Sequence, residues 1–276
     1  MATPRPAVPP NDLPNDLPIR PVALVTGGGR RLGAVIAQML ARHGWGIALH
    51  YRQSAAEAET LVQSMNAEGH AAIGCQLSLD ASLTPARADQ FLDDIEDRLG
   101  PVTLIVNNAS QFEFDLADSA TPDSMRGHHE TNLIAPVTLT QALYRRCTRF
   151  ERQGVVINLL DQKLDNPNPD FFSYTLSKAG LLWATRLMAQ ALAPTLRVVG
   201  VSPGITLPSA DQTPEEFQVT HRQTPLGRSS TAEDVAQAVV WLASAPAVTG
   251  THLLVDGGQH LQPAARDVMF STRPAL

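Results

Sequence analysis

The strongest constraint on the fold is a regular alternation, from Pro21 onward, of short apolar runs with helix-forming segments. The apolar runs are typical of buried strands and cover residues 21–27, 46–51, 71–77, 102–108, 154–160, 196–202 and 251–256. Helical periodicity is found at residues 32–44, 54–69, 84–100, 122–149 (interrupted or bent near Pro136), 172–193 and 231–244. Strands that alternate with helices form a parallel sheet, and apolar strands indicate that helices cover both of its faces.

No linker interrupts this pattern, so we expect one domain over residues 21–262. Residues 1–20 are rich in proline and contain the block NDLP twice, which predicts a disordered tail. Residues 263–276 form a C-terminal tail. This tail either closes a pocket, of its own or of a neighbouring subunit, or is disordered.

Composition excludes several classes of function. The net charge is −6 without a long basic run, which argues against a nucleic-acid surface. Cys75 and Cys147 are isolated, so neither a disulfide framework nor a zinc spacing is present, and we expect no metal site. No apolar run could span a bilayer and no signal peptide is apparent, so we expect a soluble cytoplasmic protein without a membrane partner.

The sequence TGGGRRLG, residues 26–33, lies between the first predicted strand and the first predicted helix. Backbone N–H groups at such a helix end favour an anion, typically phosphate, and glycines let the backbone approach it. The lysine of a P-loop is missing, and the G-x-G-x-x-G fingerprint cannot be placed in any register. The remaining pattern is T-G-x-x-x-R-x-G; a plain tight turn is the alternative.

The end of the second strand, LHYRQS at residues 49–54, bears on the choice of cofactor. Enzymes that bind NAD usually have an acid there for the ribose 2′-hydroxyl. Here no carboxylate precedes Glu57, whereas His50, Arg52 and Ser54 are present. Arginine and serine suit a 2′-phosphate, so the segment favours NADP(H). An ordinary surface cation is the alternative for Arg52.

Tyr174 and Lys178 are spaced to share one face of a helix. An ammonium beside a phenol lowers its pKa, which makes the hydroxyl a usable acid near neutrality. Asn107, Asp161 and Pro203-Gly204 all lie at the carboxyl ends of predicted strands, so all could line one crevice with Thr26. For Tyr174 and Lys178, the alternative is an ordinary pair on the surface of a helix.

Together these motifs resemble the short-chain dehydrogenase/reductase family. TGGGRRLG, NNAS at 107–110, YTLSK at 174–178 and the PG at 203–204 occur in that family's order and spacing. The resemblance implies a single Rossmann-like, doubly wound α/β domain, usually a homotetramer. It also implies hydride transfer between NAD(P)(H) and a carbonyl, alcohol or imine.

Two departures from the family pattern, Arg31 for glycine and Asp161 for the usual serine, resemble the pteridine reductases and the related bacterial dihydromonapterin reductases. LHYRQSAAEA at 49–58 and NNASQF at 107–112 resemble the same branch. The family often has an aspartate that holds the adenine amino group, and Gln76 stands in that place. The branch's arginine after the second strand aligns with Gln53, and Arg52 stands one place earlier.

The motifs and the resemblance together imply the site residues. The implied catalytic residues are Asn132, Asp161, Tyr174 and Lys178. The implied NADP(H) contacts are Gly27, Arg30, Arg31, Leu32, Gly33, His50, Tyr51, Arg52, Ser54, Leu77, Asn107, Ala109, Tyr174, Lys178, Pro203, Gly204 and Thr206. The implied contacts of a pterin-like heterocycle are Arg31, Ser110, Phe112, Asp161 and Tyr174, with the Phe112 ring stacked on one face of the heterocycle.

The predicted reaction is reduction by NADPH of the C=N bond of a dihydropterin, with dihydrofolate as a second candidate. Tyr174 supplies a proton and Lys178 lowers the pKa of Tyr174. Asp161, with a raised pKa in an apolar pocket, orients the substrate and assists protonation; a loop cap is the alternative for Asp161. The rival functions are a carbonyl reductase, such as a 3-oxoacyl thioester reductase, and a non-catalytic nucleotide-binding protein on the same fold.

We also draw expectations for three further parts of the chain. Residues 205–228 are polar and follow Pro203-Gly204, so we expect a mobile substrate lid, with a plain surface excursion as the alternative. Trp183, Leu187 and Met188 are expected in the core or in a subunit interface. Adjacent His128 and His129 favour a surface or interface position over a metal site.

Overall fold

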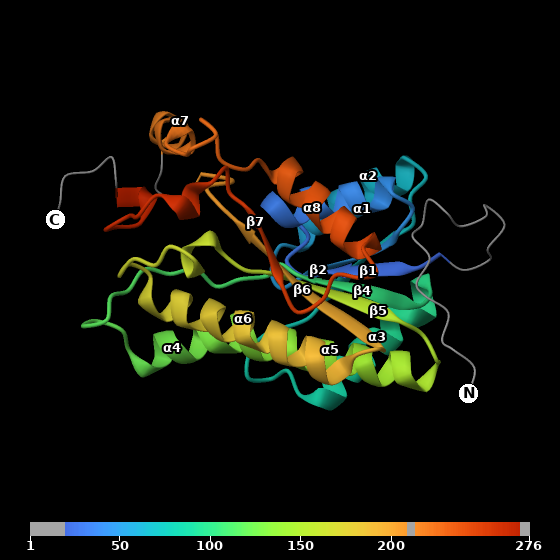
Figure 1. Ribbon diagram of the computed structural model, residues 1–276. Coiled ribbons are helices and arrows are strands. Elements are labelled where there is room, and N and C mark those ends of the chain that lie inside the picture. Colours follow the sequence, from blue (N-terminus) through green and yellow to red (C-terminus); the bar gives the residue numbers. More distant parts are fainter. Residues whose placement is uncertain (1–19, 209–212, 271–276) are drawn as a thin grey trace.

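The structure is a computed structural model that describes residues 20–208 and 213–270. Seven strands form one parallel sheet in the order β3-β2-β1-β4-β5-β6-β7 (Figure 1). The strands are β1 Val22–Val25, β2 Gly46–Tyr51, β3 Ala72–Gln76, β4 Val102–Asn107, β5 Gly154–Leu159, β6 Leu196–Pro203 and β7 His252–Val255. This order confirms the predicted doubly wound α/β fold.

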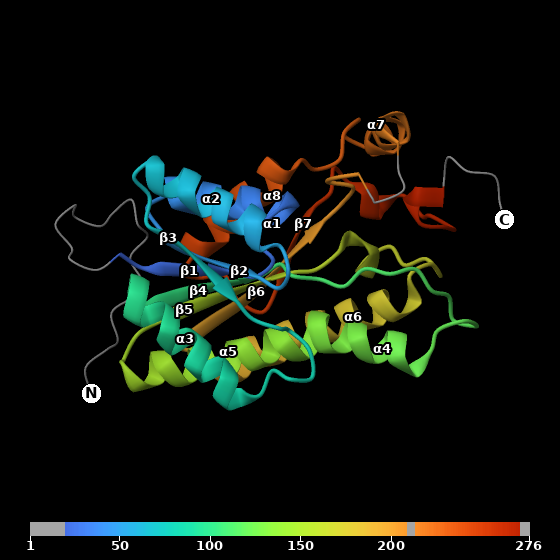
Figure 2. The ribbon, with the colours of Figure 1, turned by 180° about the vertical axis from the view of Figure 1, so that it is seen from behind.

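Helices cover both faces of the sheet (Figures 1 and 2). One layer consists of α1 Arg31–Arg42, α2 Ala55–Ala67 and α8 Ala232–Ser244. The other consists of α3 Pro85–Leu99, α4 Pro122–His129, α5 Ala135–Arg149 and α6 Phe172–Leu192. Strand residues alternate between the two cores: Ala23 and Val25 pack with α1 and α8, whereas Val22 and Leu24 pack with α3 and α5. This period of two explains why both faces of the strands are apolar.

The helix predicted over 122–149 is broken where α4 passes into α5. A π-helical turn, Glu130–Ile134, separates them, and the Ala135 N–H bonds to the Glu130 carbonyl oxygen five residues back. Pro136 follows directly and has no N–H for an α-helical bond, which favours the irregularity there. The prediction of a break near Pro136 is confirmed, and the break lies just before the proline.

The segment 205–228 contains a helix that the sequence analysis missed, α7 Pro214–Arg222. Thr213 caps it: its side chain accepts from the Glu216 N–H, and the Glu216 carboxylate accepts from the Thr213 N–H. The T-P-E-E sequence carries this capping-box signal, and the polar composition of the segment obscured it. In Figures 1 and 2, α7 lies beside the C-terminal residues, at the end of the sheet where the carboxyl ends of β6 and β7 lie.

The strand order reverses between β1 and β4, and this places a crevice beyond their carboxyl ends. The glycine turn follows β1 and the NNAS segment follows β4, so the topology brings both to that crevice. Of the predicted tails, residues 1–19 and 271–276 lie outside the described residues, whereas residues 263–270 are described. Within the described ranges, no helix is long and apolar enough to cross a membrane, and no group of three or more metal-binding side chains is found.

Candidate active site

The glycine turn is held against the end of β4 by hydrogen bonds. Gly27 has φ +61°, and a Cβ on Gly33 would lie 2.3 Å from the Gly27 carbonyl oxygen, so both positions require glycine. The Asn108 side chain donates to the carbonyl oxygens of Thr26 at 2.9 Å and Gly27 at 3.2 Å. Thr26 Oγ1 accepts from the N–H groups of Asn108 and Ala109 at 2.9 and 3.0 Å. The turn is therefore a rigid part of the crevice.

A cavity of about 810 Å³ opens beside this turn. α1 begins there with Arg30 at its N-cap; no side chain caps the helix and its first turn contains no acid. The first N–H groups of a helix lack partners within it, so this end suits an anion. Of the predicted contacts, the cavity is lined by Gly27, Arg30, Arg31, Leu32, Gly33, His50, Tyr51, Arg52, Ser54, Ala109, Ser110 and Phe112.

Arg31 has a backbone conformation that glycine would adopt more easily. Its φ is +53°, in the left-handed region, which costs a residue with a Cβ about 1–2 kcal/mol. Its guanidinium Nη2 donates to the Pro208 carbonyl oxygen at 2.8 Å. This bond spans the crevice from the glycine turn to the segment that leads to α7. Such strain at a cavity wall is typical of a functional position.

His50 supports the turn from behind. Its Nδ1 accepts from the Gly27 N–H at 3.0 Å, and its Nε2 lies 2.9 Å from the Leu77 carbonyl oxygen, to which it donates. The side chain is 2% exposed, and burial lowers the pKa of His50 to about 4, so the ring is neutral. Both ring nitrogens have backbone partners, so His50 positions the turn although it also lines the cavity.

The end of β2 brings a cation and a hydroxyl to the same cavity. Arg52 is exposed, and Ser54, the N-cap of α2, makes no side-chain cap bond. Ser54 Oγ would lie 3.3 Å from a Cβ on Gly29, so it lies beside the glycine turn. Gln76 Nε2 donates to the Arg52 carbonyl oxygen at 3.0 Å, which ties the end of β3 to this segment. A guanidinium, a hydroxyl and an uncapped helix end together suit a phosphate group.

Tyr174, Lys178 and Asp161 meet beneath the crevice. Tyr174 Oη donates to Asp161 Oδ2 at 2.7 Å. The other carboxyl oxygen, Oδ1, accepts from the Lys163 N–H at 2.8 Å. Lys178 Nζ donates to the Leu159 carbonyl oxygen at 2.7 Å and lies 5.8 Å from the centroid of the Tyr174 ring. The phenol and the carboxyl group therefore form one hydrogen-bonded pair.

Burial dominates the electrostatics of this pair. It raises the pKa of Asp161, as predicted, against the opposing effect of the Lys163 N–H. Burial, followed by the Asp161 carboxyl group, raises the pKa of Tyr174 well above its ordinary value. The prediction that Lys178 lowers the pKa of Tyr174 is therefore wrong for this structure. Burial lowers the pKa of Lys178 itself to about 8.

Asn132 belongs to the π-helical turn and is fully buried. Its Nδ2 donates to the Gln111 carbonyl oxygen and to Ser177 Oγ, both at 2.9 Å. Its Oδ1 accepts from the Gln111 N–H at 2.8 Å. Asn132 therefore links the NNASQF segment to α6, without a hydrogen bond to Tyr174 or Lys178.

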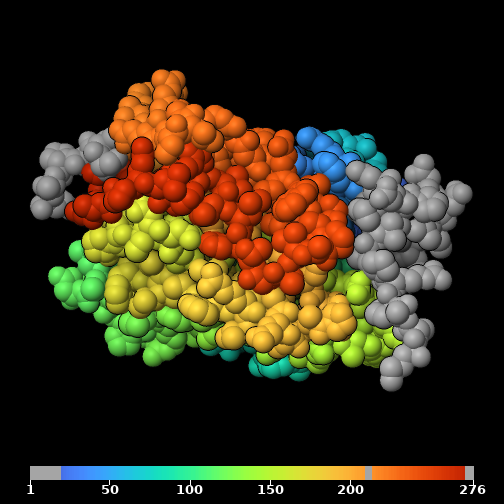
Figure 3. Space-filling view, viewed as in Figure 1, coloured from blue at the N-terminus to red at the C-terminus, as the bar shows by residue number. Residues whose placement is uncertain are grey.

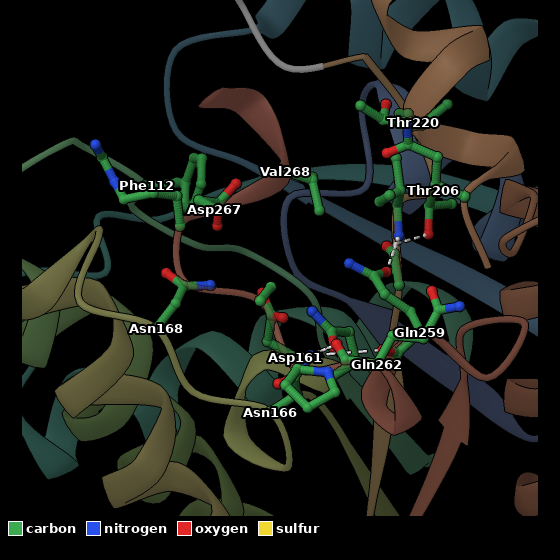
Figure 4. Close-up of a pocket in the computed structure, with 18 residues that line it drawn as sticks. Phe112, Asp161, Asn166, Asn168, Thr206, Thr220, Gln259, Gln262, Asp267 and Val268 are labelled. Atoms are coloured by element: carbon green, nitrogen blue, oxygen red, sulfur yellow. Dashed lines mark hydrogen bonds between the residues drawn. The ribbon is translucent and has the colours of Figure 1, made fainter. Parts of the chain in front are cut away.

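A second cavity of about 310 Å³ shares Phe112 with the first, and Figure 4 shows the residues that line this second cavity. Asp161, Gly204 and Thr206 line this second cavity. The Phe112 ring stacks on Phe171 at 4.2 Å and meets the Tyr174 ring edge-on at 4.7 Å. Phe112 remains 43% exposed, so an aromatic surface faces the space where the two cavities meet.

Some predicted residues line neither cavity. These are Leu77, Asn107, Asn132, Tyr174, Lys178 and Pro203. Tyr174 contacts two residues that do line a cavity, Asp161 by a hydrogen bond and Phe112 by a ring contact. Asn107 Nδ2 donates to Asn158 Oδ1 at 2.8 Å, so Asn107 joins the ends of β4 and β5.

The comparisons decide the family. The family model described as Enoyl-(Acyl carrier protein) reductase matches residues 29–260. Pteridine reductase 1 of Leishmania tarentolae is 34% identical, over 90% of this chain and 99% of that protein. The chain belongs to the short-chain dehydrogenase/reductase family.

Solved structures agree with this assignment. Alternative dihydrofolate reductase 1, FolM, from Brucella canis, complexed with NADP, has a TM-score of 0.83 and 36% identity over 90% of this chain and 96% of that chain. The FolM structure from Brucella suis, also with NADP, has a TM-score of 0.83 and 37% identity over 90% and 98%. These relatives support the pteridine reductase-like branch of the short-chain reductases, as predicted.

Several residues around the two cavities of this short-chain reductase were not predicted. They are Gln53, Glu57, Leu79, Asn108, Gln111, Glu113 and Thr131 in the larger cavity, and Gln162, Gln259, Arg266 and Asp267 among those in the smaller. Asn108 follows Asn107 in the NNAS motif, so its position at a strand end was a usable signal. Arg266 and Asp267 come from the C-terminal tail, where no local pattern indicated a site.

Proposed function

We propose that this protein uses NADPH to reduce the C=N bond of a dihydropterin to give a tetrahydropterin, with dihydrofolate as a second candidate substrate. The observation that carries the proposal is the Tyr174–Asp161 hydrogen bond of 2.7 Å beside the exposed Phe112 ring. A carboxyl group can exchange hydrogen bonds with the amino and ring N–H groups of a pterin, and an aromatic ring can stack on its plane.

The cavity beside the glycine turn fits a phosphorylated dinucleotide. A Cβ on Gly33 would collide with the Gly27 carbonyl oxygen. The absence of a side chain at Gly33 therefore lets the start of α1 pack closely against the glycine turn. The uncapped N-terminus of α1 would hold the pyrophosphate, and Arg52 with Ser54 would hold the 2′-phosphate. When bound, NADPH supplies the hydride.

Tyr174 and Asp161 hold the proton that the proposed reaction transfers to the substrate. Because the pKa values of Asp161 and Tyr174 are both raised, the pair retains a proton between Tyr174 Oη and Asp161 Oδ2 at neutral pH. In the proposed reaction this proton passes to the substrate nitrogen as the neighbouring carbon is reduced. Lys178 and Asn132 act as positioning residues, through the Leu159 carbonyl and through Gln111 and Ser177.

The test is NADPH oxidation with a 7,8-dihydropterin by the wild type and by Tyr174→Phe. We expect a loss of kcat of roughly 100- to 10,000-fold in the variant, the range for removal of a general acid. NADPH affinity, measured by fluorescence titration, should stay unchanged. Undiminished turnover by Tyr174→Phe would contradict the proposal.

A carbonyl reductase is the second candidate, because a putative ketoacyl reductase of a Streptomyces violaceoruber polyketide synthase is 32% identical over 89% of this chain and 98% of that protein. A panel of dihydropterins, dihydrofolate, ketones and 3-oxoacyl thioesters with NADPH separates the two. Preference for a 3-oxoacyl thioester would replace the pterin proposal.

We include in the proposal a homotetramer located in the cytoplasm. Leu176, Trp183 and Leu187 of α6 are 39%, 60% and 61% exposed, and their spacing places them on one side of the helix. Met188 packs against the core instead. Exposed apolar side chains in a row are typical of a subunit interface. Cell fractionation tests the location.

A further inference from the structure

The C-terminal residues return to the smaller cavity after β7 and form one of its walls. Two short 3₁₀ turns, Gln259–Leu261 and Val268–Phe270, frame the segment. Seven residues of this segment and its two turns line the cavity together with Asp161: Gln259, Gln262, Pro263, Ala264, Arg266, Asp267 and Val268. In Figure 3 the red C-terminal residues lie directly on the yellow residues near 165, beside the orange helix α7.

A buried carboxylate fixes this segment in one register. Asp170 is fully buried, and its two oxygens accept from Arg266 Nε at 2.9 and 2.8 Å. The N–H of Asp267 donates to Asp170 Oδ2 at 2.7 Å. Because the side chain of residue 266 and the backbone of residue 267 both bind the same carboxylate, the backbone from which the Asp267 side chain extends is held in place.

Asp267 and Asp161 are held by the same residue, Lys163. The Lys163 N–H bonds to Asp161, whereas its ammonium donates to Asp267 Oδ2 at 3.2 Å and to the Asp170 carbonyl oxygen at 2.6 Å. Both carboxyl groups line the cavity with Phe112 (Figure 4). The two carboxyl groups therefore form a pair on the walls of one small pocket.

The Asp267 carboxylate has acceptor capacity to spare. Its two bonds, from Lys163 Nζ and from the Met269 N–H, are both 3.2 Å, at the long end of the normal range. An ionised carboxyl group can accept about four hydrogen bonds. Arg266 is occupied by Asp170, so the Asp267 carboxylate has no bond from that neighbouring cation.

We propose that Asp267 is a second substrate-recognising carboxylate, which accepts hydrogen bonds from N–H groups of the heterocycle while Asp161 and Tyr174 hold the proton. This inference rests on the proposed function. A pterin buried against Asp161 alone would have more N–H donors than that one group can satisfy, and each unsatisfied buried donor is unfavourable.

The charges around Asp161 support these different roles of Asp161 and Asp267. The charged and titratable groups around Asp161 are Lys163, Tyr174, Lys178 and Asp267. Asp267 adds to the effect of burial and raises the pKa of both Asp161 and Tyr174. Asp267 therefore favours retention of the proton by the Tyr174–Asp161 pair, whereas its own carboxyl oxygens accept hydrogen bonds.

The experiment compares Asp267→Asn, Asp267→Glu and the surface control Asp118→Asn with the wild type. The readouts are kcat/KM for a 7,8-dihydropterin, the Kd of oxidised pterin in the presence of NADP+ (from quenching of pterin fluorescence), the Kd of NADPH, and Tm. For Asp267→Asn we expect a loss of pterin affinity and of kcat/KM of roughly 10- to 100-fold, the value of a hydrogen bond to a charged group. We expect unchanged NADPH binding, partial rescue by Asp267→Glu and no effect of Asp118→Asn.

Wild-type pterin affinity in Asp267→Asn would overturn this inference and leave the proposed function standing. Equal losses in the Asn and Glu variants, accompanied by equal falls in Tm, would assign Asp267 a structural role and also overturn it. A wild type that neither binds nor reduces a pterin would overturn the proposed function, and this inference with it.

Discussion

At the scale of single residues, two side chains beside the glycine turn have roles that their residue types alone do not reveal. Arg31 occupies a left-handed backbone position and reaches the Pro208 carbonyl. His50 is neutral and buried, with both ring nitrogens bonded to backbone atoms. In each case the local cost, of strain or of burial, is offset by contacts that shape the crevice.

Substitution of Arg31 should separate strain from binding. Arg31→Gly removes the guanidinium and relieves the backbone, whereas Arg31→Ala removes the guanidinium and keeps the strain. We expect both variants to have a KM for dihydropterin raised at least about 10-fold, since a charged hydrogen-bonding group is lost. The free energy of unfolding should be about 1 kcal/mol higher for the Gly variant than for the Ala variant. Equal unfolding free energies, measured in urea, would show that the position is unstrained.

His50 should make stability depend on pH. Its pKa is about 4 in the folded state, below the unfolded value of 6.5, so the unfolded chain binds more protons between these values. Stability is therefore fully present above about pH 6.5 and falls as the pH falls toward 4, by at most roughly 3 kcal/mol for this group. Urea unfolding at pH 7.5 and pH 5 should show a smaller difference for His50→Gln than for the wild type. The same difference in both proteins would contradict the assignment.

At the scale of elements, the site depends on how β1, α1 and β4 meet. The turn before α1 leaves no room for a side chain at Gly33, and Asn108 from the end of β4 binds the turn. The π-helical turn likewise holds the segment after β4 in place, because the Asn132 side chain binds the backbone of Gln111. Irregular backbone thus occurs on both sides of the crevice, at the glycine turn and at the π-helical turn.

Gly33→Ala tests the turn. The new Cβ would lie 2.3 Å from the Gly27 carbonyl oxygen, so the turn must move, at a cost of about 1–3 kcal/mol, the range typical of overpacking. We expect lower Tm and weaker NADPH binding. Gly46→Ala is the matched control at the start of β2, where the nearest atoms are 3.4 to 3.6 Å away. Intact NADPH affinity in Gly33→Ala would show that the turn is not the nucleotide site.

At the scale of the whole molecule, α6 carries a row of apolar side chains that neither layer of helices covers. Trp183 and Leu187 belong to α6, which lies in the lower layer in Figure 1, and are 60% and 61% exposed. The C-terminal segment, in contrast, packs against its own chain through Asp170 and Arg266. The described part of the tail therefore closes this chain's own pocket, one of the two possibilities that the sequence left open.

A charge placed in the α6 row should change the assembly. Trp183→Asp would bury an unpaired carboxylate in the proposed interface, at a cost that exceeds what the surrounding contacts provide. We expect light scattering to report a smaller species than for the wild type. Leu226→Asp is the control, because Leu226 lies outside α6 and is 78% exposed. This variant should leave the assembly unchanged. A wild type that is already monomeric, or an unaltered mass for Trp183→Asp, would contradict the interface.

Local sequence patterns determined the strands and helices of this protein and the edge of the sheet at which its candidate site lies. Periodicity distinguished strands from helices, and the rule that ligands lie at the carboxyl ends of parallel strands placed Thr26, Asp161 and Gly204 at one edge of the sheet. These inferences succeed because periodicity and strand ends are properties of neighbours in the chain. The family motifs then extended them to the set around Tyr174.

Only the tertiary structure decided what surrounds those residues. The pKa of Tyr174 is raised because the fold excludes water from the phenol and places Asp161 against it, a result that the spacing to Lys178 could not show. Asp267 reaches the site through a bond to Asp170, 97 residues earlier. Solvent exclusion and contacts between distant segments are set by how the layers pack, and for this reason the chemistry of the pocket follows from the folded chain.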